Sequence, residues 1–208
     1  FLIALGTNSL ASRIKGITIF FSLLPMIVTP LIGSLILFWM IDADGIIGST
    51  LQIIFDDNDL SLKASPTLTW IMLILYGIWH STPFAFIVFY AGLQTVPQET
   101  LEASMLDGAS LWQQKRYVVI PYLMPLIIFV TLIQLMDNFR VFEPIVGFNA
   151  SANATSLSWI IYNDLRGEDA LQLFGSAAAT SMLTIIGVGI LLIPVLIKIW
   201  KEFNSKTV

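Results

Sequence analysis

The 208-residue sequence contains no cysteine and a single histidine, His80. These residues therefore form neither disulfides nor thiolate metal sites, and one imidazole excludes a multi-histidine zinc or iron centre. No G-x4-G-K-[ST] segment occurs, so the phosphate loop of an ATPase is absent from the sequence. Charged residues make up only 12% of the chain, against roughly 25% in soluble proteins, while 56% of residues are hydrophobic. This balance predicts an integral membrane protein.

Four long apolar runs predict an all-α, polytopic helical bundle, because a helix needs about 20 apolar residues to cross a bilayer. The opening letters FLIALG resemble the end of another apolar segment, so we expect part of the protein to precede Phe1. Pro25 and Pro30 predict kinks in the first run and a face turned towards protein or a cavity. The expected spans cover residues 17–41, 67–93, 122–142 and 176–197 of one transmembrane domain, 1–208.

The distribution of Lys and Arg predicts how the chain is oriented. Seven of these residues fall on one side of the expected spans and three elsewhere, and the richer side faces the cytoplasm. The loop 94–121 and the C-terminus are therefore expected in the cytoplasm, with segments 42–66 and 143–175 outside. Within the first external segment, one short amphipathic helix is expected from Ile46 to Phe55.

The polar stretch from Gln94 to Pro125 separates two apolar runs and carries helix-end signals. Thr95 and Gln98 have the spacing of an N-cap and its partner, with a proline between them, so a short helix should begin there. Gly108 stands where a left-handed C-terminal cap would be needed. The pattern predicts a helix that ends at a glycine corner.

A second short helix is expected to begin at Ser110, which repeats the capping-box spacing with Gln113, and to run until Pro121. The helix, glycine and helix resemble the signature loop of binding-protein-dependent ABC importer permeases, E-A-A-x3-G-x9-I-x-L-P. The matching residues are Glu102, Ala103, Ser104, Gly108, Val118, Ile120 and Pro121. Ser, Val and Ile replace the family's second Ala, its Ile and its Leu, and the spacing is intact. The surrounding letters AGLQTVPQETLEAS resemble the maltose and glycerol-phosphate type of sugar importer.

The resemblance implies a type I importer permease: a bacterial inner-membrane subunit, not an enzyme, that forms the pathway for a sugar or related polyol. Its implied partners are a second, similar permease, two ATP-binding subunits and an extracytoplasmic binding protein. ATP and magnesium would bind the ATPase subunits; no cofactor is expected on this chain, and no nucleic acid. An ordinary loop is the alternative explanation of residues 94–121. The residues expected to couple to the ATPase are Glu99, Glu102, Ala103, Ser104, Asp107, Gly108 and Pro121.

Polar and aromatic residues at membrane depth are candidates for the substrate pathway, because such groups are costly in lipid. One candidate group, Tyr76, Trp79 and His80, has the i, i+3, i+4 spacing of a single helical face. The other follows the third span and consists of Asp137, Asn138, Phe139, Arg140, Phe142 and Glu143. The alternatives are that His80 is a packing residue, and that the second group snorkels to the interface or pairs internally.

Several other hypotheses remain open at this point. A membrane-embedded enzyme would use His80 and the group from Asp137 to Glu143 as acid and base, and a passive channel would need no ATP. Arg140 would suit an anionic sugar. Two aromatic residues in the external segment, Trp159 and Tyr162, fit an interfacial belt or a contact with the binding protein. The aspartates at 56, 57 and 59 predict a solvated loop rather than a calcium site.

Overall fold

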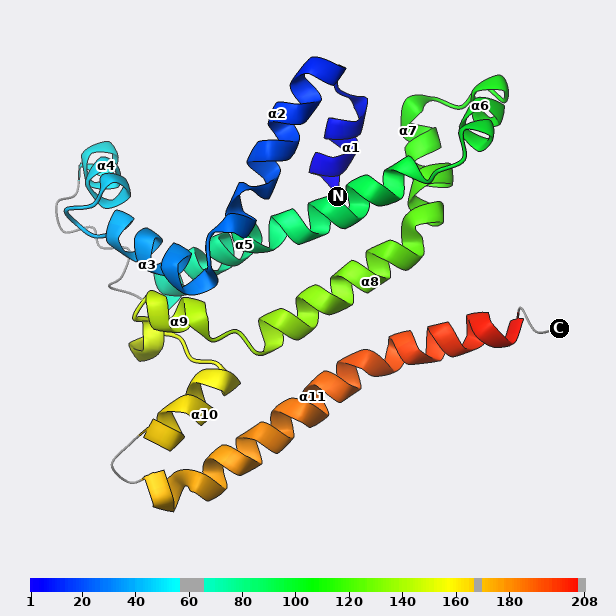
Figure 1. Ribbon diagram of the computed structural model, residues 1–208. Coiled ribbons are helices and arrows are strands. Elements are labelled where there is room, and N and C mark those ends of the chain that lie inside the picture. Colours follow the sequence, from blue (N-terminus) through cyan, green and yellow to red (C-terminus); the bar gives the residue numbers. More distant parts are fainter. Residues whose placement is uncertain (57–65, 167–169, 206–208) are drawn as a thin grey trace. The chain divides into compact units, whose positions relative to one another are not determined.

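The computed structural model describes residues 1–56, 66–166 and 170–205, and the described residues form helices connected by short turns. Their order along the chain is drawn in Figure 1. The elements before the coupling loop are α1 (Leu2–Ser9), α2 (Ser12–Leu23), η1 (Leu24–Ile27), α3 (Pro30–Met40), α4 (Ile46–Phe55) and α5 (Pro66–Gln94). They are followed by α6 (Gln98–Leu106), α7 (Leu111–Gln114), η2 (Lys115–Val119), α8 (Ile120–Phe139), α9 (Glu143–Gly147), η3 (Ala150–Ala152), α10 (Leu157–Arg166) and α11 (Ala170–Ser205).

Three described helical stretches are long and apolar enough to cross a membrane: Pro66–Gln94, Leu111–Phe139 and Leu173–Pro194. A fourth span results if the helices on either side of Thr29 are counted as one. The all-α membrane fold is therefore confirmed, with three spans, or four if the bent pair is one span. The short helix predicted from Ile46 to Phe55 is present over the same residues as α4.

The kinks predicted at Pro25 and Pro30 are present as a break in the run 17–41. The chain passes from α2 into the 3-10 turn η1, and it leaves helical geometry before α3 begins at Pro30. Thr29 is extended, with φ −64° and ψ 149°, as expected for a residue that precedes a proline. Pro30 then occupies the first turn of α3, where its missing N–H leaves no helical bond unmade.

In contrast, Pro83 lies inside its helix without breaking it. α5 continues from Pro66 to Gln94 through Pro83, whose side chain is fully buried. The neighbouring Ser81 carbonyl accepts a hydrogen bond from Nε2 of Gln134, 3.2 Å away on α8. The proline is thus enclosed by protein, and a side chain of α8 bonds to the α5 backbone two residues before it.

Contacts divide the chain into two compact units, and α5 and α8 each contribute to both. One unit comprises Phe1–Ile27 with Ser81–Gln134, and the other comprises Val28–His80 with Leu135–Val208. The assignment of a single domain stays a prediction, because these units are defined by contacts and not by independent folding.

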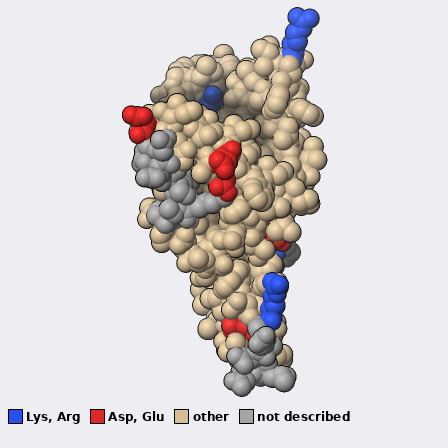
Figure 2. Space-filling model, turned by 90° about the vertical axis from the view of Figure 1, so that its left-hand side faces the viewer, with Lys and Arg blue, Asp and Glu red and all other residues tan. Residues whose placement is uncertain are grey.

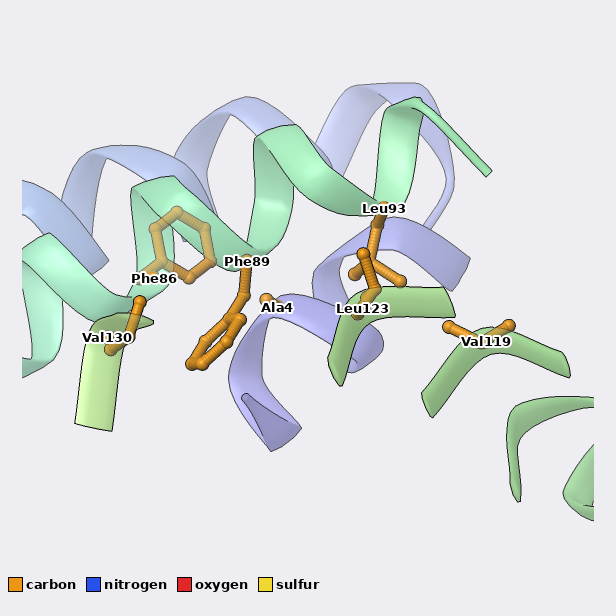
Figure 3. Close-up of a cluster of buried hydrophobic side chains, with 7 residues drawn as sticks. All are labelled: Ala4, Phe86, Phe89, Leu93, Val119, Leu123 and Val130. Atoms are coloured by element: carbon orange, nitrogen blue, oxygen red, sulfur yellow. The ribbon is translucent and has the colours of Figure 1, made fainter. Parts of the chain in front are cut away.

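In the first unit, α1 packs against the C-terminal part of α5 and the N-terminal part of α8. Its buried cluster consists of Ala4, Phe86, Phe89, Leu93, Val119, Leu123 and Val130, whose side chains converge in Figure 3. Gly92 allows the close approach, because a Cβ there would lie 2.5 Å from Cδ1 of Leu126. The Tyr122 hydroxyl donates to the Thr95 carbonyl at 2.8 Å and joins the two helices at the end nearest the loop.

In the second unit, α3 packs against α9 and the N-terminal part of α5. The buried residues are Ile41, Tyr76, Ile145, Phe148, Ala150 and Ala154. α3 and α9 meet at Gly147, where a Cβ would overlap Oγ of Ser34 and lie 3.0 Å from the Leu31 carbonyl oxygen. This crossing therefore requires glycine, since one of its two neighbours is backbone.

Replacement of Gly147 by alanine is expected to destabilise the protein by roughly 1–3 kcal/mol, the usual cost of overpacking. The measurement is the thermal unfolding midpoint of the detergent-solubilised protein. Gly189→Ala is the matched control, because a Cβ on this α11 glycine meets no atom within 4 Å. Equal midpoints for the two variants would contradict the close α3–α9 contact.

Candidate functional site

The predicted coupling loop is a short helix, a corner and the start of a long helix. α6 begins at Gln98 with Pro97 as its N-cap, and no side chain caps it. The predicted capping role of Thr95 is therefore wrong. Its hydroxyl donates instead to the Gly92 carbonyl at 2.8 Å and satisfies the C-terminal end of α5, where carbonyls lack helical partners.

The corner after α6 has the predicted glycine geometry. Gly108 has φ +78°, and its N–H donates to the Met105 carbonyl at 3.0 Å. The N–H of Ala109 donates to the Ser104 carbonyl, also at 3.0 Å. These two bonds form a Schellman motif, which requires a left-handed residue at the glycine position. The expected left-handed glycine cap is thus confirmed.

The second helix starts as predicted but does not stop at Pro121. Ser110 and Gln113 form a reciprocal capping box, with bonds of 2.7 and 3.4 Å. α7 then continues through the π-helical turn η2 into α8, so one helical stretch runs from Leu111 to Phe139. The N–H of Ile120 bonds to the carbonyl five residues earlier, and Pro121 needs no such bond. The wide turn places the proline where its missing N–H is tolerated.

All seven predicted coupling residues belong to this loop or to the helix that leaves it. Glu99, Glu102 and Ala103 are exposed on α6, while Asp107 and Gly108 are exposed at the corner. Ser104 is half-buried, and its hydroxyl donates to the Leu101 carbonyl at 2.7 Å. Pro121 is exposed in the first turn of α8. The loop therefore offers an anionic helix face next to a rigid turn.

An apolar group around the corner was missed by sequence reasoning. Leu106 is 90% exposed, and Trp112 is 66% exposed on the other side of Gly108. Met105 and Leu111 are also exposed beside them. We call these four residues the corner patch. The available signal was the presence of large apolar residues inside a polar loop, which is unusual unless a partner covers them.

The aromatic group on α5 shares one face, as the spacing predicted. The rings of Tyr76 and His80 stack with centroids 5.8 Å apart and 9° between their planes, and Tyr76 and Trp79 are 5.9 Å apart. Tyr76 is only 2% exposed, and its hydroxyl donates to the Pro30 carbonyl at 2.7 Å. This arrangement gives Tyr76 a packing role, and its contact with substrate stays a prediction.

A cavity of about 500 Å³ lies beside this face, within the second unit. Tyr76 and Trp79 line it, and the other lining residues are Val28, Gly33, Ile36, Leu37, Met40, Met72 and Leu75. Sugar hydroxyls that lose water need hydrogen-bond partners, and aliphatic side chains offer none. Because most of its lining is aliphatic, this cavity offers few hydrogen-bond partners to sugar hydroxyls. His80 is not part of the lining, and its Nδ1 is buried without a hydrogen bond to any described residue.

The second pathway group is partly engaged within the protein. Arg140 and Asp137 form an ion pair at 3.4 Å with both side chains exposed, which bears out the internal pairing weighed from the sequence. Phe139 packs on α11, since a Cβ on Gly187 would lie 2.5 Å from its ring. Phe142 contacts Tyr162 edge to face with centroids 5.2 Å apart. Asn138 and Glu143 are exposed.

No group of three or more His, Asp or Glu side chains in the described ranges could hold a metal ion. The aspartates at 57 and 59 lie outside those ranges. Asp56 is described and ends α4 in a left-handed conformation, with φ 52°.

Comparison with known proteins identifies the family. Residues 2–200 match the model of the binding-protein-dependent transport system inner membrane component. The trehalose/maltose transport system permease protein MalF of Thermococcus litoralis is 30% identical over 125 residues, which cover 59% of this chain and 41% of that protein. The trehalose transport system permease protein SugA of Mycobacterium tuberculosis is 34% identical over 95 residues, covering 45% and 31%. The chain thus spans less than half the length of these relatives.

A solved structure has the same fold. It is the crystal structure of a bacterial ABC transporter involved in the import of the acidic polysaccharide alginate. The alignment has a TM-score of 0.79 with 22% identity, and it covers 92% of this chain and 68% of the other. Since the family match extends over almost the entire chain, this protein belongs to the family of binding-protein-dependent transport system inner membrane components.

Proposed function

We propose that the chain is a membrane-spanning subunit of an ATP-driven importer and forms part of the pathway for a sugar or related polyol. Family membership supports this role, and relatives are named for trehalose, maltose and diacetylchitobiose transport. All of these relatives are named as permeases of transport systems, which lends no support to the membrane-enzyme hypothesis. The bacterial inner membrane, with the C-terminus in the cytoplasm, is the proposed location.

The corner patch carries the proposal that a separate ATPase subunit docks on the loop 94–121. Four large apolar side chains are exposed around this corner, those of Met105, Leu106, Leu111 and Trp112. The capping box and the Schellman motif fix the backbone of the corner. Exposure of such side chains to water is unfavourable, and a partner that covers them removes this cost. Glu99 and Glu102 next to them would direct a basic surface onto α6. ATP and magnesium would then bind the partner, and this chain would bind no cofactor.

The remaining partners follow from the same family membership. A second, similar permease would complete the pathway, and a pair of ATP-binding subunits would drive it. An extracytoplasmic protein would deliver the sugar; one structural relative was solved in complex with an alginate pentasaccharide-bound periplasmic protein. No nucleic acid is expected among the partners. A rigid α6 would transmit the closure of the ATPase subunits to the spans, because the glycine corner and the capping box leave it little freedom.

Gly108→Val is expected to reduce ATP-driven uptake while the subunit still reaches the membrane. Valine strains the left-handed backbone by roughly 1–2 kcal/mol, although a Cβ there would meet no neighbouring atom within 4 Å. The loss would therefore come from the backbone and not from a clash. Gly108→Asn is the matched control, since asparagine tolerates this conformation. Uptake of radiolabelled sugar into proteoliposomes measures the effect, and unchanged uptake with valine would contradict the coupling role.

Leu106→Ala is expected to weaken binding of the ATPase subunit by roughly tenfold, since burial of a leucine side chain contributes about 1.5–3 kcal/mol. Titration of the purified ATPase subunit onto the reconstituted permease pair measures the affinity. Ile17→Ala is the control, because Ile17 is also an exposed apolar residue of the same unit but lies on α2. An equal affinity for both variants would remove the corner patch from the interface.

We further propose a neutral sugar as the substrate, because the charge of Arg140 is balanced by Asp137 at 3.4 Å. Asp137→Asn would leave the guanidinium unbalanced and is expected to raise uptake of an anionic sugar relative to a neutral one. Arg140→Gln should change that ratio in the opposite direction. Each change should be roughly fivefold, as unit charges 4 Å apart interact by about 1 kcal/mol in water. If neither variant alters the ratio, the pair does not line the pathway.

A further inference from the structure

The helix α4 is held tightly against the end of α3. A Cβ on Gly45 would overlap the carbonyl oxygens of Trp39 and Met40, and one on Gly48 would overlap that of Asp42. The N–H of Gly45 also donates to the Asp42 carbonyl at 2.8 Å. Both glycines are therefore needed for the chain to fold back so closely. α4 begins within a few residues of the point where α3 ends.

Both faces of α4 are apolar. Ile47 packs against the buried cluster of the second unit, and Gly48 is buried. The opposite face consists of Ile46, Thr50, Ile53 and Ile54, which have the i, i+4, i+7, i+8 spacing of one helical side. We call these four residues the outward stripe. Ile46 is 75% exposed and Ile53 is 81% exposed, so no described part of the chain covers the stripe.

The hydroxyl of Thr50, the polar group of the outward stripe, has a hydrogen-bond partner within α4 and so does not depend on water. The Thr50 hydroxyl donates to the Ile46 carbonyl at 2.5 Å, and on a neighbouring side the Ser49 hydroxyl donates to the Gly45 carbonyl at 2.7 Å. The ten residues of α4 carry no charge, whereas Asp42, Asp44 and Asp56 flank the helix. The stripe is thus compatible with an apolar medium between two hydrophilic ends.

We propose that α4 lies in the lipid–water interface, with the outward stripe in the acyl-chain boundary and the flanking aspartates in water. A ten-residue helix is about 15 Å long, too short for a hydrocarbon core of about 30 Å. It therefore lies along the membrane surface, with one face packed on the protein and the outward stripe turned towards lipid. The role goes beyond transport, because it concerns how the subunit is seated in its bilayer.

The position of the outward stripe next to the exposed apolar residues of α3 supports lipid as the medium that covers the stripe. α3 exposes Leu35 and Ile36 and, in its last turn, Trp39, the residue type that favours the headgroup region. The outward stripe follows after one tight turn in which Gly45 packs on the carbonyls at the end of α3, so the exposed apolar residues of α4 begin next to those of α3. Figure 2 displays a face of the protein on which uncharged side chains cover most of the surface.

The charges around α4 specify which lipid property matters. The flanking groups are acidic, and α4 itself carries no Lys or Arg that could attract anionic headgroups. Binding should therefore depend on buried apolar area alone. The inferred surface is selective for acyl chains and gains no attraction from anionic headgroups.

Spin labels at single cysteines test this inference in the full transporter complex reconstituted into liposomes. The described chain contains no cysteine, so a label can be attached at one chosen position once companion chains are cysteine-free. Ile54→Cys places the label on the outward stripe, with Ile53→Cys as a second position on it. Asp44→Cys is the aqueous control, and Leu51→Cys, on the half-buried side, is the packed control.

The expected result at Ile54 is high accessibility to oxygen and low accessibility to a water-soluble nickel chelate, while Asp44 gives the reverse. Addition of anionic lipid should leave both values unchanged. High chelate accessibility at both stripe positions would overturn the proposal in favour of an aqueous loop. Low accessibility to both reagents, as at Leu51, would overturn it in favour of a companion protein covering α4. Neither result would affect the coupling proposal, which concerns a different loop.

Discussion

The requirement that every backbone polar group in lipid finds a partner within the protein governs this chain. Three prolines in the apolar runs satisfy this requirement in different ways. Pro30 begins a helix, where its N–H would have had no helical partner. Pro83 remains inside α5, surrounded by protein. Pro121 follows a wide π-helical turn.

The corner between α6 and α7 illustrates how local chemistry alone can hold a loop in one conformation. The Schellman motif and the capping box use Gly108, Ser110 and Gln113 to satisfy helix ends without help from other elements. The corner is therefore rigid before any partner binds. Its large side chains point outward at no cost in local structure, which suits a surface that must be complementary to a separate subunit. A loop ordered only on binding would lose part of that affinity to conformational entropy.

Sequence reasoning was accurate where the relevant interactions are local. The spans follow from apolar length, and the corner follows from glycine and capping spacing. α4 was predicted from Ile46 to Phe55 with the bounds that the structure has. Sequence reasoning failed where one sequence pattern is compatible with two local structures. Thr95 can cap either the helix before it or the helix after it, and it satisfies α5. A proline can end a helix or remain inside one, depending on neighbours distant in sequence.

The sequence by itself determined the membrane class, the family signature and the two capping motifs, because composition and short-range spacing encode them. Only the tertiary structure decided which side chains face away from the protein. Tyr76 was a pathway candidate, yet its hydroxyl bonds to Pro30, 46 residues earlier in the chain. The residues of the outward stripe and of the corner patch are apolar in the sequence, and only the structure shows that no described segment covers them. Exposure depends on contacts between segments remote in sequence, and periodicity alone does not specify those contacts.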